Sequence, residues 1–326
     1  MTVAADGNLH VYVLSVGQGD TTVVVSPGGN VIIIDATRPG KVLKLLHDLD
    51  GNGAIEHLVV THPHFDHYSG CNRLARELRI QQATVAPFWH EFGMGPQTYR
   101  QLIVHLAEQE TKVTFLSGYG RWYPDGAMTT SPNGQDPKID PDKPFLELLG
   151  PTNGLVRNLE TANVFETNHL SIMSRLTWRN FRMISAGDAQ MENWEFFDHE
   201  RMMEDKCRVL RAAHHGSANG TQWERIDRLS PSQVLVSSDP ESTHDLPDLC
   251  GAAVFAEFDR ADGRIAVITK DTGTIHLKVT ATGHRTLRMH GDLPDEEVDL
   301  AAATALTQAS NPTDWRALLE DRVRDL

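Results

Sequence analysis

Apolar residues recur along this chain with two spacings, one typical of strands and one typical of helices. Three short β-branched segments, Leu9–Val16, Thr21–Ser26 and Val31–Ile34, are separated by turns that contain Gly or Pro. Such runs, bounded by turn residues, predict a meander of β-strands. The following segment, Lys41–Leu49, places its valine and leucines on one face and so predicts an amphipathic helix.

Both spacings continue through the rest of the chain. Further strands are predicted at Leu58–Val60, Ala83–Ala86, Lys112–Leu116, Phe145–Leu149, Val209–Ala213 and Val234–Ser237. Helices are predicted at Cys71–Leu78 and Pro96–Glu110. Two hairpins are expected, one over Ser171–Asp188 and a closing one that joins Ile265–Thr269 to Thr274–Val279.

The C-terminal segment differs in kind from what precedes it. We expect residues 1–290 to form one domain and residues 291–326 a helical tail, with helices from Asp295 to Gln308 and over Trp315–Leu326. Because Asn311 and Pro312 set the last helix apart, we hypothesise that it docks on a second copy of the chain or on a partner subunit. Packing against its own domain is the alternative.

Composition limits the classes of function. The chain has 326 residues, 40% of them hydrophobic, which suits one large domain with additions. Its net charge of -14 argues against a surface that grips nucleic acid by nonspecific phosphate contacts. The three cysteines form no CxxC pair, and neither a signal peptide nor a membrane span is indicated, so we expect a cytoplasmic protein.

One short stretch has the spacing of a metal site. The apolar run Leu58–Val60 is followed directly by His62, His64, Asp66 and His67. In an extended segment, residues two apart project to the same side, and Pro63 and Gly70 then turn the chain. Imidazole and carboxylate are ligands for zinc and its neighbours, so this stretch predicts a metal centre rather than a solvated histidine-rich loop.

This cluster resembles that of the metallo-β-lactamase fold family. The resemblance implies an α/β fold, an αββα sandwich of two mixed β-sheets flanked by helices. It also implies two metal ions, which are Zn²⁺ with Mn²⁺ as the alternative. His62 and His64 would bind one ion, and Asp66 and His67 the other.

The resemblance extends to residues at the ends of later strands. Asp188 matches the family's bridging carboxylate, and His214 its last ligand, with His215 lining the site, although these two histidines can exchange roles. Asp35 matches a residue that buttresses the metal loop; a simple turn former is the alternative.

The third ligand of the first metal is left open by the sequence. The typical Gly-His-Thr-x-Gly segment is absent, and Thr167–Ser171 stands in its place. Either His169 supplies the imidazole, or Asn168 occupies the position and the first metal keeps two histidines and Asp188.

Several motifs look like one branch of the family, the hydrolase domain of the bacterial DNA-uptake protein ComEC. They span Leu9 to Lys278 and are Val16–Asp20, Thr61–His67, Asn168-x-x-Ser171, Ala186–Asp188, His214–Ser217 and a late His244.

This branch implies phosphodiester hydrolysis by metal-activated water, most simply a nuclease. We expect Asp66 to orient the nucleophile, His244 to contact the scissile phosphate or protonate the leaving oxygen, and His215 to act beside them.

The expected substrate is single-stranded or short nucleic acid, or a nucleotide phosphodiester. Basic residues expected near the mouth of the site are Arg175, Arg179, Arg182, Arg208 and Arg211. Two alternatives remain: a small-molecule hydrolase (cyclic-nucleotide or phosphocholine phosphodiesterase, lactonase or thioesterase) and a non-catalytic, metal-stabilised interaction module.

Overall fold

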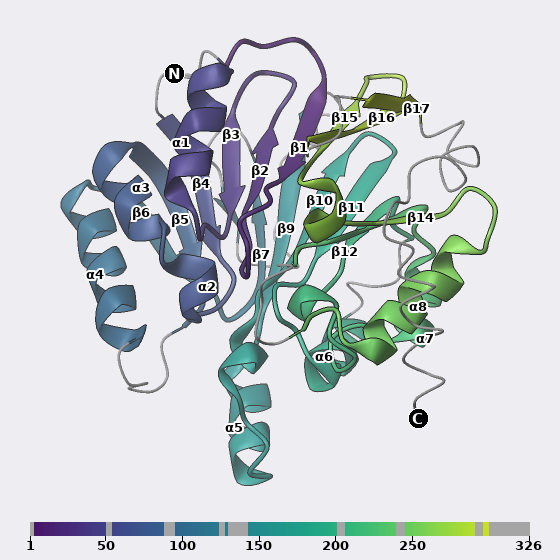
Figure 1. Cartoon of the computed structure of the whole chain (residues 1–326). Helices are drawn as coiled ribbons and strands as arrows, with labels where there is room; N and C mark the ends of the chain where they lie inside the picture. The colour runs from purple at the N-terminus through teal and green to yellow at the C-terminus, as the bar shows by residue number, and fades with distance from the viewer. Residues whose placement is uncertain are drawn as a thin grey trace.

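Two β-sheets face each other in the computed structural model, and helices cover the outer face of each sheet (Figure 1). The structure describes residues 3–49, 54–87, 95–123, 128–129, 143–200, 206–238, 245–290 and 296–299. Both sheets contain parallel and antiparallel neighbours. The predicted αββα sandwich of two mixed sheets is therefore confirmed.

The first sheet has the strand order β17-β16-β15-β1-β2-β3-β4-β5-β6 within the described residues. Its strands are β1 (Leu9–Val13), β2 (Thr22–Val25), β3 (Val31–Ile34), β4 (Ala54–Val60), β5 (Arg79–Val85), β6 (Lys112–Phe115), β15 (Thr274–Val279), β16 (Arg285–His290) and β17 (Glu296–Asp299). β3 to β6 are parallel neighbours. All four residues of β3 are buried, because the other sheet covers one of its faces and helices cover the other.

The second sheet has the order β14-β13-β12-β11-β10-β9-β7-β8. Its strands are β7 (Gly118–Trp122), β8 (Met128–Thr129), β9 (Phe145–Gly150), β10 (Met173–Trp178), β11 (Phe181–Ser185), β12 (Val209–Arg211), β13 (Gln233–Val236) and β14 (Ile265–Ile268). β11 to β14 are parallel neighbours. The predicted hairpin over Ser171–Asp188 is confirmed as β10 and β11.

Most helices lie on the two outer faces (Figure 1). The helices are α1 (Pro39–Asp48), α2 (Phe65–Tyr68), α3 (Cys71–Glu77), α4 (Gly95–Glu108), α5 (Asn153–Thr161), α6 (Met191–His199), α7 (Trp223–Leu229), α8 (Leu249–Asp259) and α9 (Thr269–Thr272), with 3-10 turns η1 (Thr167–Leu170) and η2 (His214–Gly216). α5 projects beyond the ends of the strands, and α9 lies between the two sheets in the chain. One apolar cluster fills the space between the sheets. Of the other two clusters, one lies between the first sheet and its helices and one between the second sheet and its helices. No helix in the described part of the chain is long and apolar enough to cross a membrane.

Two sequence predictions are wrong. β14 and β15 do not form a hairpin, since β14 pairs with β13 in the second sheet and β15 pairs with β1 in the first. The short connection between them forms α9 and carries the chain from one sheet to the other. The sequence predicts a helix from Asp295, but Glu296–Asp299 form strand β17, which pairs with β16. The rest of the tail lies outside the described residues.

Candidate metal centre

The metal loop begins where β4 ends. His62 and His67 are completely buried, and their ring centroids are 4.2 Å apart. The ring centroid of His64, which precedes α2, lies 4.7 Å from that of His62. A strand end followed by one helical turn thus brings the three imidazoles of the motif together.

Asp35 holds this loop from the end of β3. Its Oδ1 accepts from the backbone N–H of Thr61 at 2.8 Å, and its Oδ2 accepts from the Thr61 hydroxyl at 2.7 Å. The Nδ1–H of His67 also donates to Oδ2, at 2.8 Å. The prediction that Asp35 buttresses the loop is confirmed, and its left-handed φ of 56° is a strained conformation of the kind found at functional sites.

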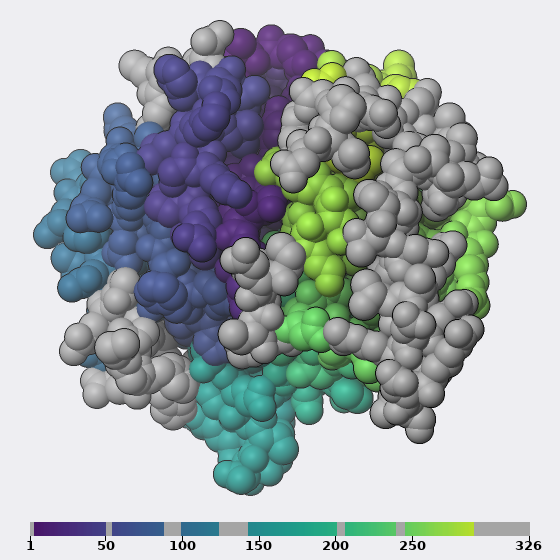
Figure 2. Space-filling model, viewed as in Figure 1, coloured from purple at the N-terminus to yellow at the C-terminus, as the bar shows by residue number. Residues whose placement is uncertain are grey.

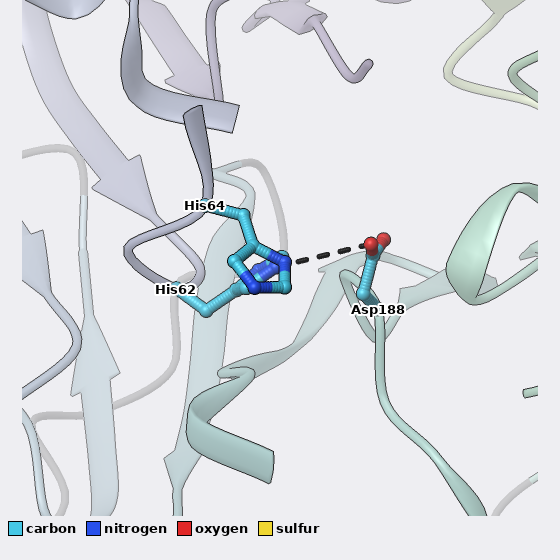
Figure 3. Close-up of side chains that lie close together, drawn as sticks. All are labelled: His62, His64 and Asp188. Carbon is cyan, nitrogen blue, oxygen red and sulfur yellow. Dashed lines mark ion pairs between the residues drawn. The ribbon is translucent and has the colours of Figure 1, made fainter. Parts of the chain in front are cut away.

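Asp188 follows β11 and faces the metal loop across the two sheets. Its Oδ1 lies 3.2 Å from His67 Nε2, and its Oδ2 lies 3.8 Å from His62 Nε2. Figure 3 shows the carboxylate of Asp188 opposite the imidazoles of His62 and His64. A Cβ on the preceding Gly187 would lie 2.9 Å from Thr61 Cβ, so glycine permits this close approach.

His215, not His214, completes the cluster, so the two histidines exchange the expected roles. His215 is buried, and its Nε2 lies 3.5 Å from Asp66 Oδ2 and 3.6 Å from Asp188 Oδ2. Both ring nitrogens of the half-buried His214 are engaged elsewhere: Asn168 donates to Nε2 at 3.3 Å, and Nδ1 donates to Asn219 at 2.8 Å. Left-handed φ values of 49° and 52° at His214 and His215 turn the two rings in different directions.

His169 belongs to none of the groups of described residues that could hold a metal ion, so the structure does not support the alternative that made it a ligand. The N–H of Glu166 donates to its Nδ1 at 2.8 Å, and its Nε2 donates to Glu192 at 3.2 Å. Asn168 instead faces His214, and its buried Oδ1 has no hydrogen-bond partner. The other alternative, a first metal with two histidines and Asp188, agrees with this geometry.

Two adjoining triads can each hold a metal ion: His62, His64 and Asp188 form one, and Asp66, His67 and His215 form the other. In each triad the ligand atoms lie within 4.8 Å of one another. Two further groups of three side chains also have the spacing of a metal site: Asp20, Asp188 and His215, and Asp20, Asp35 and His67. Because Asp35 already receives hydrogen bonds from the loop, we assign it to support rather than to ligation.

The hydrogen bonds of the buried histidines fit a metal. His62, His67 and His215 each use Nδ1 toward a protein oxygen, namely Thr61 Oγ1, Asp35 Oδ2 and Ser237 O. The Nε2 atoms of all three are buried without a hydrogen-bond partner. Histidine ligands commonly donate the other ring N–H to such an oxygen, which aims the free nitrogen at the metal. Neither His214 nor His169 has this arrangement.

Electrostatics favour a cation at the same place. Burial and the charge of His67 hold the pKa of His62 well below 6.5, so His62 is in the neutral form that binds metal. Burial opposes ionisation of Asp188, but the charges of His67 and His215 outweigh it and hold the pKa of this carboxyl well below 3.8. Burial also lowers the pKa of His67, yet Asp188 and Asp35 raise it well above 6.5.

Sequence reasoning assigned no role to Asp20 and placed Arg211 at the mouth of the site. Arg211 is instead 1% exposed, and its Nη2 donates to Asp20 Oδ1, which lies 3.5 Å from His215 Nδ1. The pair ties the turn after β1 to the end of β12. The sequence did offer one signal: Arg211 lies within the otherwise apolar run from Val209 to Ala213. A charged residue in a buried strand needs a partner of opposite charge.

The other arginines expected at the mouth do not lie there either. Arg175 donates to Glu147 at 2.6 Å on the second sheet. Arg179, Arg182 and Arg208 stand before or at the start of β11 and β12, whereas the cluster follows the ends of these strands. His244 lies outside the described residues, and its contact with the scissile phosphate stays a prediction.

Comparison with solved structures finds similar folds. The chain is similar to a variant of CmlA, a diiron β-hydroxylase from Streptomyces venezuelae, with a TM-score of 0.52 and 13% identity over 83% of this chain and 54% of that chain. It is also similar to YhfI from Bacillus subtilis, with a TM-score of 0.46 and 11% identity over 82% of this chain and 99% of that chain. At these identities the likeness concerns the fold alone.

Family membership rests on a sequence model. The model of the metallo-beta-lactamase superfamily matches residues 14–234, which is more than half of the chain and includes every residue of the two triads. A comparison with curated protein sequences finds no match. The chain belongs to the metallo-β-lactamase superfamily.

Proposed function

We propose that this protein is a dinuclear metal-dependent hydrolase that cleaves phosphodiester bonds in single-stranded or short nucleic acid. One observation carries the proposal. Three buried histidines direct unpartnered Nε2 atoms toward the carboxylates of Asp66 and Asp188 at the junction of the two sheets. His62, His64 and Asp188 would hold one ion, and Asp66, His67 and His215 the other, with Asp188 between them.

The chain's own residues prepare this site for hydrolysis. Bound Zn²⁺ or Mn²⁺ supplies an acidified water and positive charge toward the substrate oxygen. Asp35, Thr61 and Ser237 fix the orientation of the histidines before a ligand arrives. The side chain of Asp66 is 29% exposed, so its carboxylate borders both the cluster and solvent, where it can orient an attacking water.

The likeness to the ComEC hydrolase domain supports a phosphodiester substrate, because each described motif touches the cluster. Ser171 Oγ accepts from the N–H of Asp188 at 3.1 Å, and Asp20 Oδ1 lies 3.5 Å from His215 Nδ1. Gly19 packs so closely that a Cβ there would lie 2.4 Å from the carbonyl oxygen of Asp66. The resemblance thus involves residues that shape the site.

The net charge of the protein limits the length of nucleic acid that it can hold. The net charge is -14, and the arginines expected at the mouth are buried, paired or at the other end of the strands. A protein that holds long duplex DNA neutralises many phosphates, which this chain is poorly equipped to do. A small phosphodiester is the second candidate, since it needs still fewer cationic contacts than a short strand.

A substrate panel tests the proposal. Full-length protein loaded with Zn²⁺ or Mn²⁺ is incubated with single-stranded DNA, RNA, long duplex DNA, cyclic dinucleotides, a lactone and a thioester. We expect cleavage of single strands and short oligonucleotides, and weaker action on long duplex. Asp188→Asn should remove the activity, whereas Glu257→Gln on the exposed side of α8 should keep it. Cleavage of only the lactone or thioester would refute the phosphodiesterase assignment.

A further inference from the structure

A cleft of about 620 Å³ opens beside Asp66, on the outer side of the metal loop. Its walls come from the turn after β1, from the start of α1 and from α2, and its lining residues are Gln18, Thr37, Arg38, Pro39, Phe65, Asp66, Ser69 and Gly70. α1 and α2, in blue, both lie on the face seen in Figure 2. The volume lies within the range of small-molecule sites.

Arg38 supplies the cationic side of this cleft. It is exposed, and its Nε donates to the carbonyl oxygen of Val16 at 3.1 Å, which orients the guanidinium from the Val16–Asp20 motif. No other side-chain hydrogen bond or ion pair of Arg38 occurs among the described residues. The remaining N–H donors are therefore available to an anion, for which a planar guanidinium is well suited.

Phe65 supplies the aromatic side. It lies between His64 and Asp66 in the metal loop, yet it is 65% exposed, the largest exposed fraction among the big apolar side chains of the described residues. Its ring meets Tyr68 edge-on with centroids 6.0 Å apart, so a face of the ring is available for stacking. Proteins that bind single-stranded nucleic acid combine aromatic rings, on which bases stack, with cationic groups that hold the backbone.

We propose that this cleft binds the nucleotide unit adjacent to the scissile phosphodiester, with its base stacked on Phe65 and its phosphate held by Arg38. The proposal rests on the proposed function, because it takes the scissile bond to lie at the triads. It assigns substrate preference to two side chains that hold no metal. A nucleotide with a base is then preferred to the same sugar phosphate without one.

Calorimetric titration of the full-length, metal-loaded protein tests this assignment. Adenosine 5'-monophosphate should bind about tenfold more tightly than ribose 5-phosphate, since only the first ligand has a base that can stack on Phe65. Phe65→Leu keeps apolar bulk but removes the ring, so it should bring the two affinities together. Arg38→Gln should weaken both ligands by a similar factor and preserve their ratio.

Lys44→Gln is the matched control for charge. Lys44 is on α1, which Arg38 immediately precedes, and it is 74% exposed, but it does not line the cleft. If Lys44→Gln and Arg38→Gln weaken ligand binding equally, the effect comes from the overall charge of the protein, and the role of Arg38 is overturned. Equal affinities of the two ligands in the parent protein, or no binding of either, would overturn the site.

Hydrolysis separates this proposal from the function on which it rests. If the parent cleaves oligonucleotides, both cleft variants should raise KM and leave kcat nearly unchanged, because the metal ligands are intact. Base-dependent binding without any phosphodiester cleavage would retain the nucleotide site and reject the proposed function. Cleavage with unchanged KM in both variants would retain the proposed function and reject the nucleotide site.

Discussion

Asp188 is the residue on which the two halves of the site depend. Its Oδ1 lies 3.2 Å from His67 Nε2, and its Oδ2 lies 3.8 Å from His62 Nε2, so one carboxylate faces a histidine of each triad. Removing a histidine takes a ligand from one triad only. If Asp188 serves both ions, as we propose, removing it takes an anion from both.

Metal content measures this difference. We expect the parent to carry about two transition-metal ions per chain. Asp188→Ala should lose more metal than His62→Ala or His67→Ala, as determined by elemental analysis after gel filtration. A parent with one ion per chain, unchanged in Asp188→Ala, would contradict the dinuclear arrangement.

Arg211 and Asp20 form a second critical contact at the residue scale. Burial lowers the pKa of Arg211 to about 9, and the side chains of Arg211 and Asp20 are 1% and 4% exposed. Arg211→Met leaves the buried carboxylate unpaired and should lower the free energy of unfolding by about 3 to 5 kcal/mol. Urea unfolding monitored by tryptophan fluorescence gives this value.

The double variant Asp20→Asn with Arg211→Met is the internal control. It contains no unpaired charge, so it should be more stable than Arg211→Met alone. Strictly additive losses would show that the pair does not couple.

At the scale of elements, the second sheet contains a charged network across β7, β9 and β10. Glu147 of β9 stands opposite Arg121 of β7 and Arg175 of β10 in the strand register. Its carboxylate accepts from Arg175 at 2.6 Å, from Arg121 at 2.7 Å and from Tyr119 at 2.8 Å. Burial raises the pKa of Glu147, but these donors outweigh it and hold the pKa below the ordinary value of 4.5.

This network makes stability depend on pH. Because the pKa of Glu147 is lower in the folded state than in the unfolded state, its contribution is complete above about pH 4.5 and is lost as the pH falls through the folded-state pKa. Glu147→Gln should cost about 1.5 to 3 kcal/mol at neutral pH and make the acid side of the stability profile flatter. Urea midpoints across this pH range test the expectation.

The comparison variant is Glu257→Gln, whose ion pair with Arg260 is on the surface. Glu257 and Arg260 are 55% and 69% exposed, so solvent screens their attraction. The variant should leave the midpoint and its pH dependence nearly unchanged. A parallel loss in both variants would assign the effect to net charge rather than to the network.

For the whole molecule, the sequence-based hypothesis about the C-terminal tail stays a prediction. The segment Trp315–Leu326 lies outside the described residues, and its apolar residues at helical spacing suggest a docking helix. If this helix joins two copies, the full chain should exceed monomer mass in light scattering, and truncation after Gln308 should restore the monomer. A full chain that is already monomeric, with no change in state on truncation, would exclude docking between copies.

Most strands and the metal loop could be predicted from the sequence because their causes are local. β-branched runs bounded by turns specify strands such as β3, and the offsets within His62–His67 bring three imidazoles and a carboxylate together within six residues. The support from Asp35 was predicted through the family resemblance. These features depend on few contacts between distant parts of the chain.

The tertiary structure decided what depends on distant partners or on backbone conformation. Left-handed backbone at His214 and His215, adjacent in sequence, sends one ring to Asn168 and the other to the cluster. Arg211 meets Asp20, 191 residues away, because the sheets pack face to face. The sequence by itself determined which side chains can bind metal; only the packing of the two sheets determined which of them converge, since no local pattern encodes contacts between separate sheets.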